Sequence, residues 1–177
     1  HLTIMKNLIL KEFKLNAHFR LSEGLRMIQI AISKVDNDLL WKRPTASGMS
    51  IGNQLIHCSG NMTQYIISSL ANSKDNRDRD LEFTLSGGLN KKELLDQLEN
   101  TVKNAQEIIK NTSEQEFERV RTVQGFKMSG VGSSLHAVEH FSYHIGQIAF
   151  WVKQETKESL SFYDRFDLTI KNNEDVD

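Results

Sequence analysis

The chain has 177 residues, with 22 basic and 23 acidic side chains and a formal net charge of −1. This length is typical of one domain, and the near-neutral charge argues against a surface that binds nucleic acid. The lone cysteine excludes an internal disulfide and fits a reducing compartment. No apolar run reaches the roughly 18 positions of a membrane span. We therefore predict a soluble, cytoplasmic chain without nucleic-acid or membrane partners, forming one domain over 1–177 with its core at about 6–155 and a tail at 156–177.

The first half of the chain has the apolar spacing of two helices. Apolar residues at three- and four-residue intervals predict a long amphipathic helix over about 5–34, in which Gly24 is the weakest point. Ser50 is suited to cap a second helix over about 51–70. The polar stripe of this second helix, which includes His57, faces either water or a polar cleft inside the fold.

The second half adds two more helices with irregular segments between them. The charged stretch at 72–89 predicts a loop, and the spacing over 90–109 predicts a third helix. Glycines and weak alternation over 112–134 predict a short extended or hairpin segment. A fourth helix is predicted over about 135–153. Together these segments predict an all-α four-helix bundle, whose long connections permit crossovers.

Three histidines recur every four residues in the fourth predicted helix, at His136, His140 and His144. Each step of four residues advances a side chain by about 40° around a helix axis, so the imidazoles form one column. Imidazoles at i and i+4 can bind one cation together, and a third ligand must then come from another helix. The pair is either His136 and His140 or His140 and His144. His18 and His57 are the candidates for the third ligand.

Two other interpretations of this column stay open. Helical histidines often pack or face solvent without binding any ligand. In addition, the stretch His136-Ala-Val-Glu139-His140 matches H-x-x-E-H, a zinc-peptidase pattern in which the glutamate is the general base. Five-residue matches arise readily by chance, and no carboxylate elsewhere is an evident further ligand, so we do not favour the peptidase interpretation.

Residues next to the histidines have weaker functional signals. Asn61, one turn after His57, either binds substrate or is simply a polar helix residue. Gln147, three residues after His144, either touches a pocket or bridges helices as a buried amide. Cys58 points towards the apolar stripe, which predicts a packed thiol and not a nucleophile.

Two aromatic residues of the fourth helix, Tyr143 and Phe150, project away from its apolar stripe. Large apolar side chains on such a face are typical of contact surfaces. They predict either a subunit contact in a homodimer or a face covered by the tail around Phe162.

The arrangement of these motifs resembles the DinB/YfiT-like superfamily. The resemblance rests on Ser50-Ile-Gly-Asn-Gln-Leu-Ile-His57 in the second helix and on His140-x3-His144-Ile-Gly-Gln147-Ile in the fourth, with Trp41-Lys-Arg-Pro44 upstream. It covers about residues 6–155. It implies a four-helix bundle in the order up-down-down-up, and a divalent metal (zinc, nickel or iron) held by His57, His140 and His144.

The resemblance also implies a class of chemistry. His136 then lies one turn outside the ligand set and, with Asn61 and Gln147, is a candidate for substrate binding. Three neutral imidazoles leave the metal open positions, at which a water becomes acidic or a thiolate binds. Characterised members of the superfamily are similar to thiol-dependent transferases and isomerases that use glutathione, mycothiol or bacillithiol. We therefore expect a metal-dependent thiol S-transferase, or a hydrolase, that acts on a small molecule with a low-molecular-weight thiol as co-substrate; a non-catalytic, stress-associated metal-binding module is the alternative.

Overall fold

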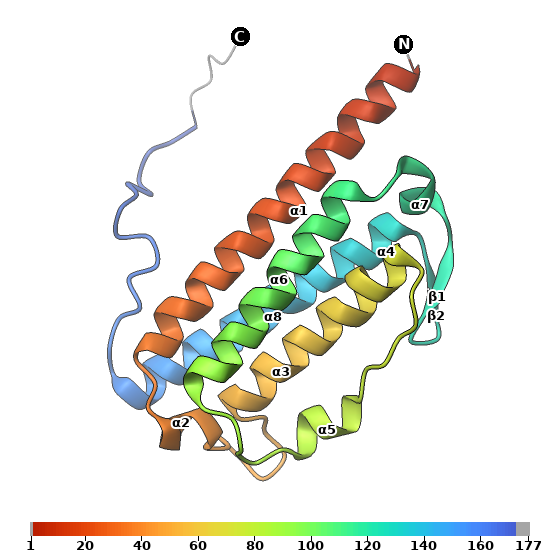
Figure 1. The fold of residues 1–177 in the computed structure, drawn as a ribbon. Coiled ribbons are helices and arrows are strands. Elements are labelled where there is room, and N and C mark those ends of the chain that lie inside the picture. The colour runs from red at the N-terminus through yellow and green to blue at the C-terminus, as the bar shows by residue number, and fades with distance from the viewer. Residues whose placement is uncertain (1, 173–177) are drawn as a thin grey trace.

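Long helices form the body of the molecule. The chain is described from a computed structural model that covers residues 2–172, with side chains from residue 8 onward. Four long helices lie side by side: α1 (Leu2–Ser33), α3 (Ile51–Met62), α6 (Lys91–Asn111) and α8 (Gly130–Thr156) (Figure 1). Helices α1 and α8 run in one direction and α3 and α6 in the opposite direction (Figure 1). The all-α bundle and its up-down-down-up order are therefore confirmed.

Shorter elements connect the long helices. The predicted second helix continues from α3 through a π-helical stretch, and the predicted hairpin is present, with Arg121 paired to Met128 in antiparallel register. The prediction that 72–89 is entirely loop is wrong, because this segment contains α5; a helix of six residues is too short to produce a periodic pattern. The short elements are α2 (Asn37–Trp41), η1 (Thr63–Ser68), α4 (Ser69–Ala71), α5 (Arg79–Thr84), α7 (Glu114–Glu118), β1 (Arg121–Val123) and β2 (Phe126–Met128).

Each long helix packs against two others. Helix α1 contacts α6 and α8, and α3 contacts the same two helices. Apolar side chains from all four helices fill the space between them, and each fully buried leucine, isoleucine or phenylalanine stabilises the fold by about 1.5–3 kcal/mol. Gly24, expected to be the weakest point of α1, is where α1 meets α8: a Cβ there would lie 2.6 Å from Cε1 of Phe141. Helix α8 also packs against α3, and the predicted histidine site lies between those two helices.

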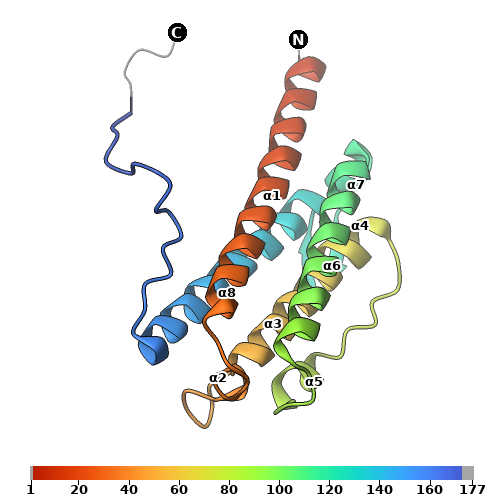
Figure 2. The same ribbon diagram turned by 60° about the vertical axis from the view of Figure 1, so that its left-hand side comes forward.

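After α8 the chain continues as an extended tail on the side of α1 (Figure 1, Figure 2). The predicted tail at 156–177 is described as far as residue 172. Phe162 packs against the core, whereas Tyr143 and Phe150 are 64 % and 60 % exposed. The expectation that the tail covers these two aromatic residues is therefore wrong, and the homodimer contact stays a prediction. None of the helices in the described part of the chain is long and apolar enough to cross a membrane.

Candidate metal centre

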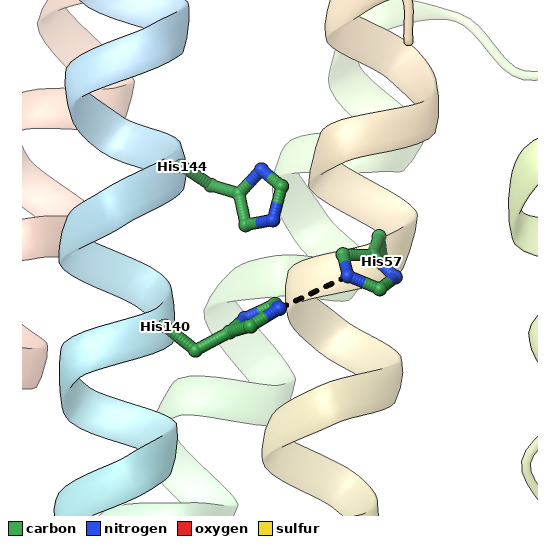
Figure 3. A group of neighbouring side chains, drawn as sticks. All are labelled: His57, His140 and His144. Atoms are coloured by element: carbon green, nitrogen blue, oxygen red, sulfur yellow. Dashed lines mark hydrogen bonds between the residues drawn. The ribbon is translucent and has the colours of Figure 1, made fainter.

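Three histidines from two helices meet between α3 and α8 (Figure 3). His57 comes from α3, and His140 and His144 come from α8. One ring nitrogen of each lies within 4.8 Å of the other two, and the Nε2 atoms of His57 and His140 are 3.0 Å apart. Two nitrogens that bind one zinc ion at about 2.0–2.1 Å lie roughly 3.3 Å apart in tetrahedral geometry. Among the described residues, this histidine triad is the group of side chains placed to hold a metal ion.

The positions of these histidines follow from how each helix is built. Ser50 and Asn53 form a capping box that sets the start of α3, and His57 follows two turns later. On α8, His140 and His144 are one turn apart and point towards α3 (Figure 3). Since α3 and α8 pack together, the polar stripe of the second predicted helix faces an internal polar contact and not water.

Hydrogen-bond partners on the outer side of two rings determine their tautomers. Nδ1 of His57 lies 2.7 Å from Oε2 of Glu82, and Nδ1 of His144 lies 3.0 Å from Oε1 of Gln54. Arg77 Nη2 is also 3.1 Å from His57 Nδ1, but it donates to Oε2 of Glu82 at 2.8 Å, so the carboxylate accepts from both groups. Because Glu82 and Gln54 present acceptors, we assign the proton to Nδ1 in both histidines. Their Nε2 lone pairs are therefore available to a cation in the triad.

His140 lacks such a partner. Its Nδ1 is buried, without a hydrogen-bond partner among the described residues, while its Nε2 faces Nε2 of His57. A proton on Nε2 leaves a bare lone pair at Nδ1, and a proton on Nδ1 leaves an unpaired N–H with two lone pairs facing each other across 3.0 Å. A buried polar atom without a partner costs about 1–3 kcal/mol. A cation between the Nε2 atoms removes the repulsion of the facing lone pairs, so the donor set fits a metal.

Burial favours the neutral form of the two α8 histidines of the triad. It lowers the pKa of His140 to about 3, with the neighbouring histidines adding to the effect, and the pKa of His144 to about 4, where His57 contributes less than burial. Burial alone would raise the pKa of Glu82, but hydrogen bonds from Arg77 and His57 hold it below its ordinary value. Neutral imidazoles beside an ionised carboxylate are the protonation states that a bound cation requires.

His136 lies outside the triad. Its ring packs against Tyr65, with centroids 4.1 Å apart, and is 5.8 Å from the ring of His140. Its Nε2 is 3.5 Å from Nδ2 of Asn61, whose Oδ1 is buried without a hydrogen-bond partner among the described residues. The structure therefore brings together His140 and His144 with His57 of α3, and places His136 and Asn61 as a pair one turn away. Gln147 is half-buried on the part of α8 that follows His144.

The other candidates are separated from the triad. His18 is exposed and lines a groove between α1 and α6, so it is not the third ligand. Glu139 is exposed and lines a groove with Arg20 of α1, and His136 is not part of the triad, so the structure does not favour the H-x-x-E-H interpretation. Cys58 is buried in the core, where burial raises the pKa of its thiol, which confirms a packed thiol.

Three residues that contact the triad, Gln54, Arg77 and Glu82, were not predicted from the sequence to have this role. Arg77 and Glu82 lie in the stretch that was predicted to be a loop. One signal was present: Gly60 occupies the interior of a helix, where glycine often indicates close approach of another segment. A Cβ at this position would overlap Oε1 of Glu82 and lie 3.0 Å from Nε of Arg77.

Comparisons with known proteins place the chain in a family. A family model described as "Protein of unknown function (DUF1572)" matches residues 9–164. Among solved structures, the DinB-like protein YjoA from Bacillus subtilis has a similar fold, with a TM-score of 0.61 and 14 % identity over 79 % of this chain and 91 % of that one. A comparison with proteins of curated function finds no match. The chain therefore belongs to the DUF1572 family, and its fold is similar to that of a DinB-like protein.

Proposed function

We propose that this protein is a metal-dependent enzyme that acts on a small molecule, with His57, His140 and His144 holding a divalent cation. The observation that carries the proposal is the convergence of three imidazole nitrogens, two of them from rings whose tautomers are set by Glu82 and Gln54. When bound, a divalent cation supplies Lewis acidity and coordination positions for a water or a thiolate. Zinc, nickel and iron all accept imidazole ligands.

The number of donors supports a catalytic role over a structural one. Structural zinc sites usually have four protein ligands, whereas catalytic sites have three and keep a position open. The carboxylate in contact with the triad is Glu82, and its oxygens accept hydrogen bonds from Arg77 and from Nδ1 of His57. Glu82 therefore supports a ligand and does not act as the fourth.

Residues beside the triad are suited to bind the substrate. The unpartnered Oδ1 of Asn61 can accept a hydrogen bond from an N–H or O–H group. Burial lowers the pKa of His136, which favours its neutral ring, and the lone pair of a neutral imidazole can accept a hydrogen bond from a substrate. We propose a thiol S-transferase reaction on this basis, with Asn61 and His136 contacting substrate on one side of the triad and Gln147 on the other.

Metal analysis of the purified chain tests the ligand set. We expect one equivalent of metal in the unmodified protein and a loss of binding in His57→Ala, His140→Ala and His144→Ala. His136→Ala is the matched control, since it removes an imidazole one turn away and should leave the stoichiometry unchanged. Full metal content in His57→Ala would refute the three-ligand site, and loss in His136→Ala with retention in His144→Ala would move the site up one turn.

A turnover assay tests the reaction. The metal-loaded protein is mixed with glutathione or bacillithiol and an aromatic halide, and thioether formation is followed by absorbance. Thiol-dependent turnover should disappear after treatment with a chelator and return with added metal. If there is no turnover and the bundle unfolds when the metal is removed, the chain is instead a non-catalytic, stress-associated metal-binding module.

A further inference from the structure

The segment between α4 and α6 contributes two charged side chains to the region around the histidine triad. We propose that Glu82 and Arg77 are positioning residues of the metal centre. Glu82 orients His57 and strengthens it as a ligand, and Arg77 holds the Glu82 carboxylate in place. This inference rests on the proposed metal site and extends it to a part of the chain from which none of the three ligands comes.

Every oxygen of the Glu82 carboxylate has a defined partner. Arg77 donates from Nε to Oε1 at 2.7 Å and from Nη2 to Oε2 at 2.8 Å. Nδ1 of His57 lies 2.7 Å from Oε2, and Arg77 Nη1 donates to Oε1 of Gln64 on η1 at 2.9 Å. The side chains of Glu82 and Arg77 are only 5 % and 3 % exposed. The carboxylate is thus locked on one side by Arg77 and faces the metal ligand on the other.

Stability alone is a poor explanation for this arrangement. A buried ion pair must lose its hydration, so it is often no more stabilising than well-packed apolar residues of similar volume. The contact also requires Gly60, because a Cβ there would overlap Oε1 of Glu82. A glycine in a helix interior is less stable than alanine by about 0.5–1 kcal/mol. The buried ion pair and the helical glycine are both unfavourable for stability. Both lie at the Glu82 carboxylate, which contacts His57.

The segment that contains α5 is also held to the rest of the fold by hydrogen bonds that do not involve the Glu82 carboxylate. Nδ2 of Asn53 donates to the backbone oxygens of Glu82 and Leu85 at 3.0 and 2.7 Å, and Nη2 of Arg43 donates to the oxygen of Phe83 at 2.6 Å. These bonds can hold α5 in place when the Glu82 side chain is changed. An effect on metal binding can therefore be separated from an effect on folding.

The three ligands have outer partners of unequal strength. His57 contacts a carboxylate, His144 contacts the neutral amide of Gln54, and Nδ1 of His140 has no partner among the described residues. An anionic acceptor at Nδ1–H makes Nε2 a stronger donor to a metal, and loss of such a partner typically weakens metal binding 10- to 100-fold. The carboxylate of Glu82 should therefore matter most.

The zinc affinity of the 177-residue chain tests the inference. It is measured by competition with a chromophoric chelator and checked by the visible spectrum of the cobalt(II) form. Glu82→Gln should bind zinc about 10- to 100-fold more weakly, at unchanged stoichiometry. The double variant Arg77→Gln, Glu82→Gln should show the same loss without an unpaired buried charge, so it decides the outcome if the single variant folds poorly. Gly60→Ala should weaken zinc binding in the same direction by displacing the carboxylate.

Glu116→Gln is the matched control, because Glu116 of α7 pairs with Arg119 at 2.8 Å and with Arg121 at 3.5 Å, away from the triad. It should leave zinc affinity and the cobalt spectrum unchanged. Unchanged affinity in both Glu82→Gln and the double variant, with normal binding by the unmodified chain, would overturn this inference alone. An unmodified chain that binds no zinc or cobalt would overturn the proposed function and the inference together.

Discussion

Replacement of Gly24 by alanine tests the packing of α1 on the helix that carries two of the three histidines. A Cβ at this position would lie 2.6 and 2.9 Å from Cε1 and Cδ1 of Phe141 and 2.7 Å from Cδ1 of Ile145. The Ile145 methyl can rotate aside. The Phe141 ring is 2 % exposed and surrounded by core, so it can move only if its neighbours or the helices move too.

Two opposing effects set the size of the change. Overpacking in a core costs about 1–3 kcal/mol, whereas alanine is favoured over glycine in a helix by about 1 kcal/mol. We therefore expect Gly24→Ala to lower the free energy of unfolding by up to about 2 kcal/mol. Gly146 of α8 is the matched control, because a Cβ there meets no atom within 4 Å. Gly146→Ala should raise the free energy of unfolding by about 0.5–1 kcal/mol.

Thermal unfolding followed by far-UV circular dichroism measures both variants. In a chain of this size, 1 kcal/mol corresponds to about 2–4 °C in Tm, so the two variants should move Tm in opposite directions by measurable amounts. If Gly24→Ala were as stable as Gly146→Ala, α1 and α8 would be able to separate at no cost. Gly24 would then not be required for the contact between α1 and α8.

Three further predictions concern the buried groups. In protein stripped of metal, His140 and His144 have pKa values of about 3 and 4, below the ordinary 6.5, so the unfolded chain binds more protons below pH 6.5. The free energy of unfolding should therefore fall as the pH drops below 6.5. At pH 5 the loss is about 2 kcal/mol for His144 and less for the more exposed His140. A free energy of unfolding, measured by denaturant titration, that is the same at pH 7 and pH 5 would contradict this. Gln54→Ala removes the acceptor of His144 and should weaken zinc binding by about tenfold in a chelator competition, with unchanged affinity as the opposing result. Cys58 should react with a disulfide reagent only after denaturation, because its thiol is buried with a raised pKa; rapid labelling of the native protein would disprove this.

Local sequence patterns were sufficient to predict the helical framework. The 3.6-residue period of the long helices depends only on residues a few positions apart, as do the glycines and weak alternation of the hairpin region, so both were recognisable without knowledge of their neighbours. The short helices and one irregular stretch were not predicted, and two of them show why. Helix α5 has six residues, too few for a period, and the π-helical stretch η1 differs from α-helix only in its hydrogen-bond register.

One part of the candidate metal site could also be predicted from the sequence, whereas the other part depends on the tertiary structure. The sequence by itself determined that His136, His140 and His144 form a column on one helix, because that follows from their four-residue spacing. Which of them meet a third ligand depends on how α8 aligns with α3. In the structure His140 and His144 face His57, whereas His136 faces Tyr65. Burial of the triad and the approach of the segment with Glu82 also depend on contacts between residues far apart in the chain. Such contacts leave no periodic pattern, so only the tertiary structure decided which imidazoles converge and what supports them.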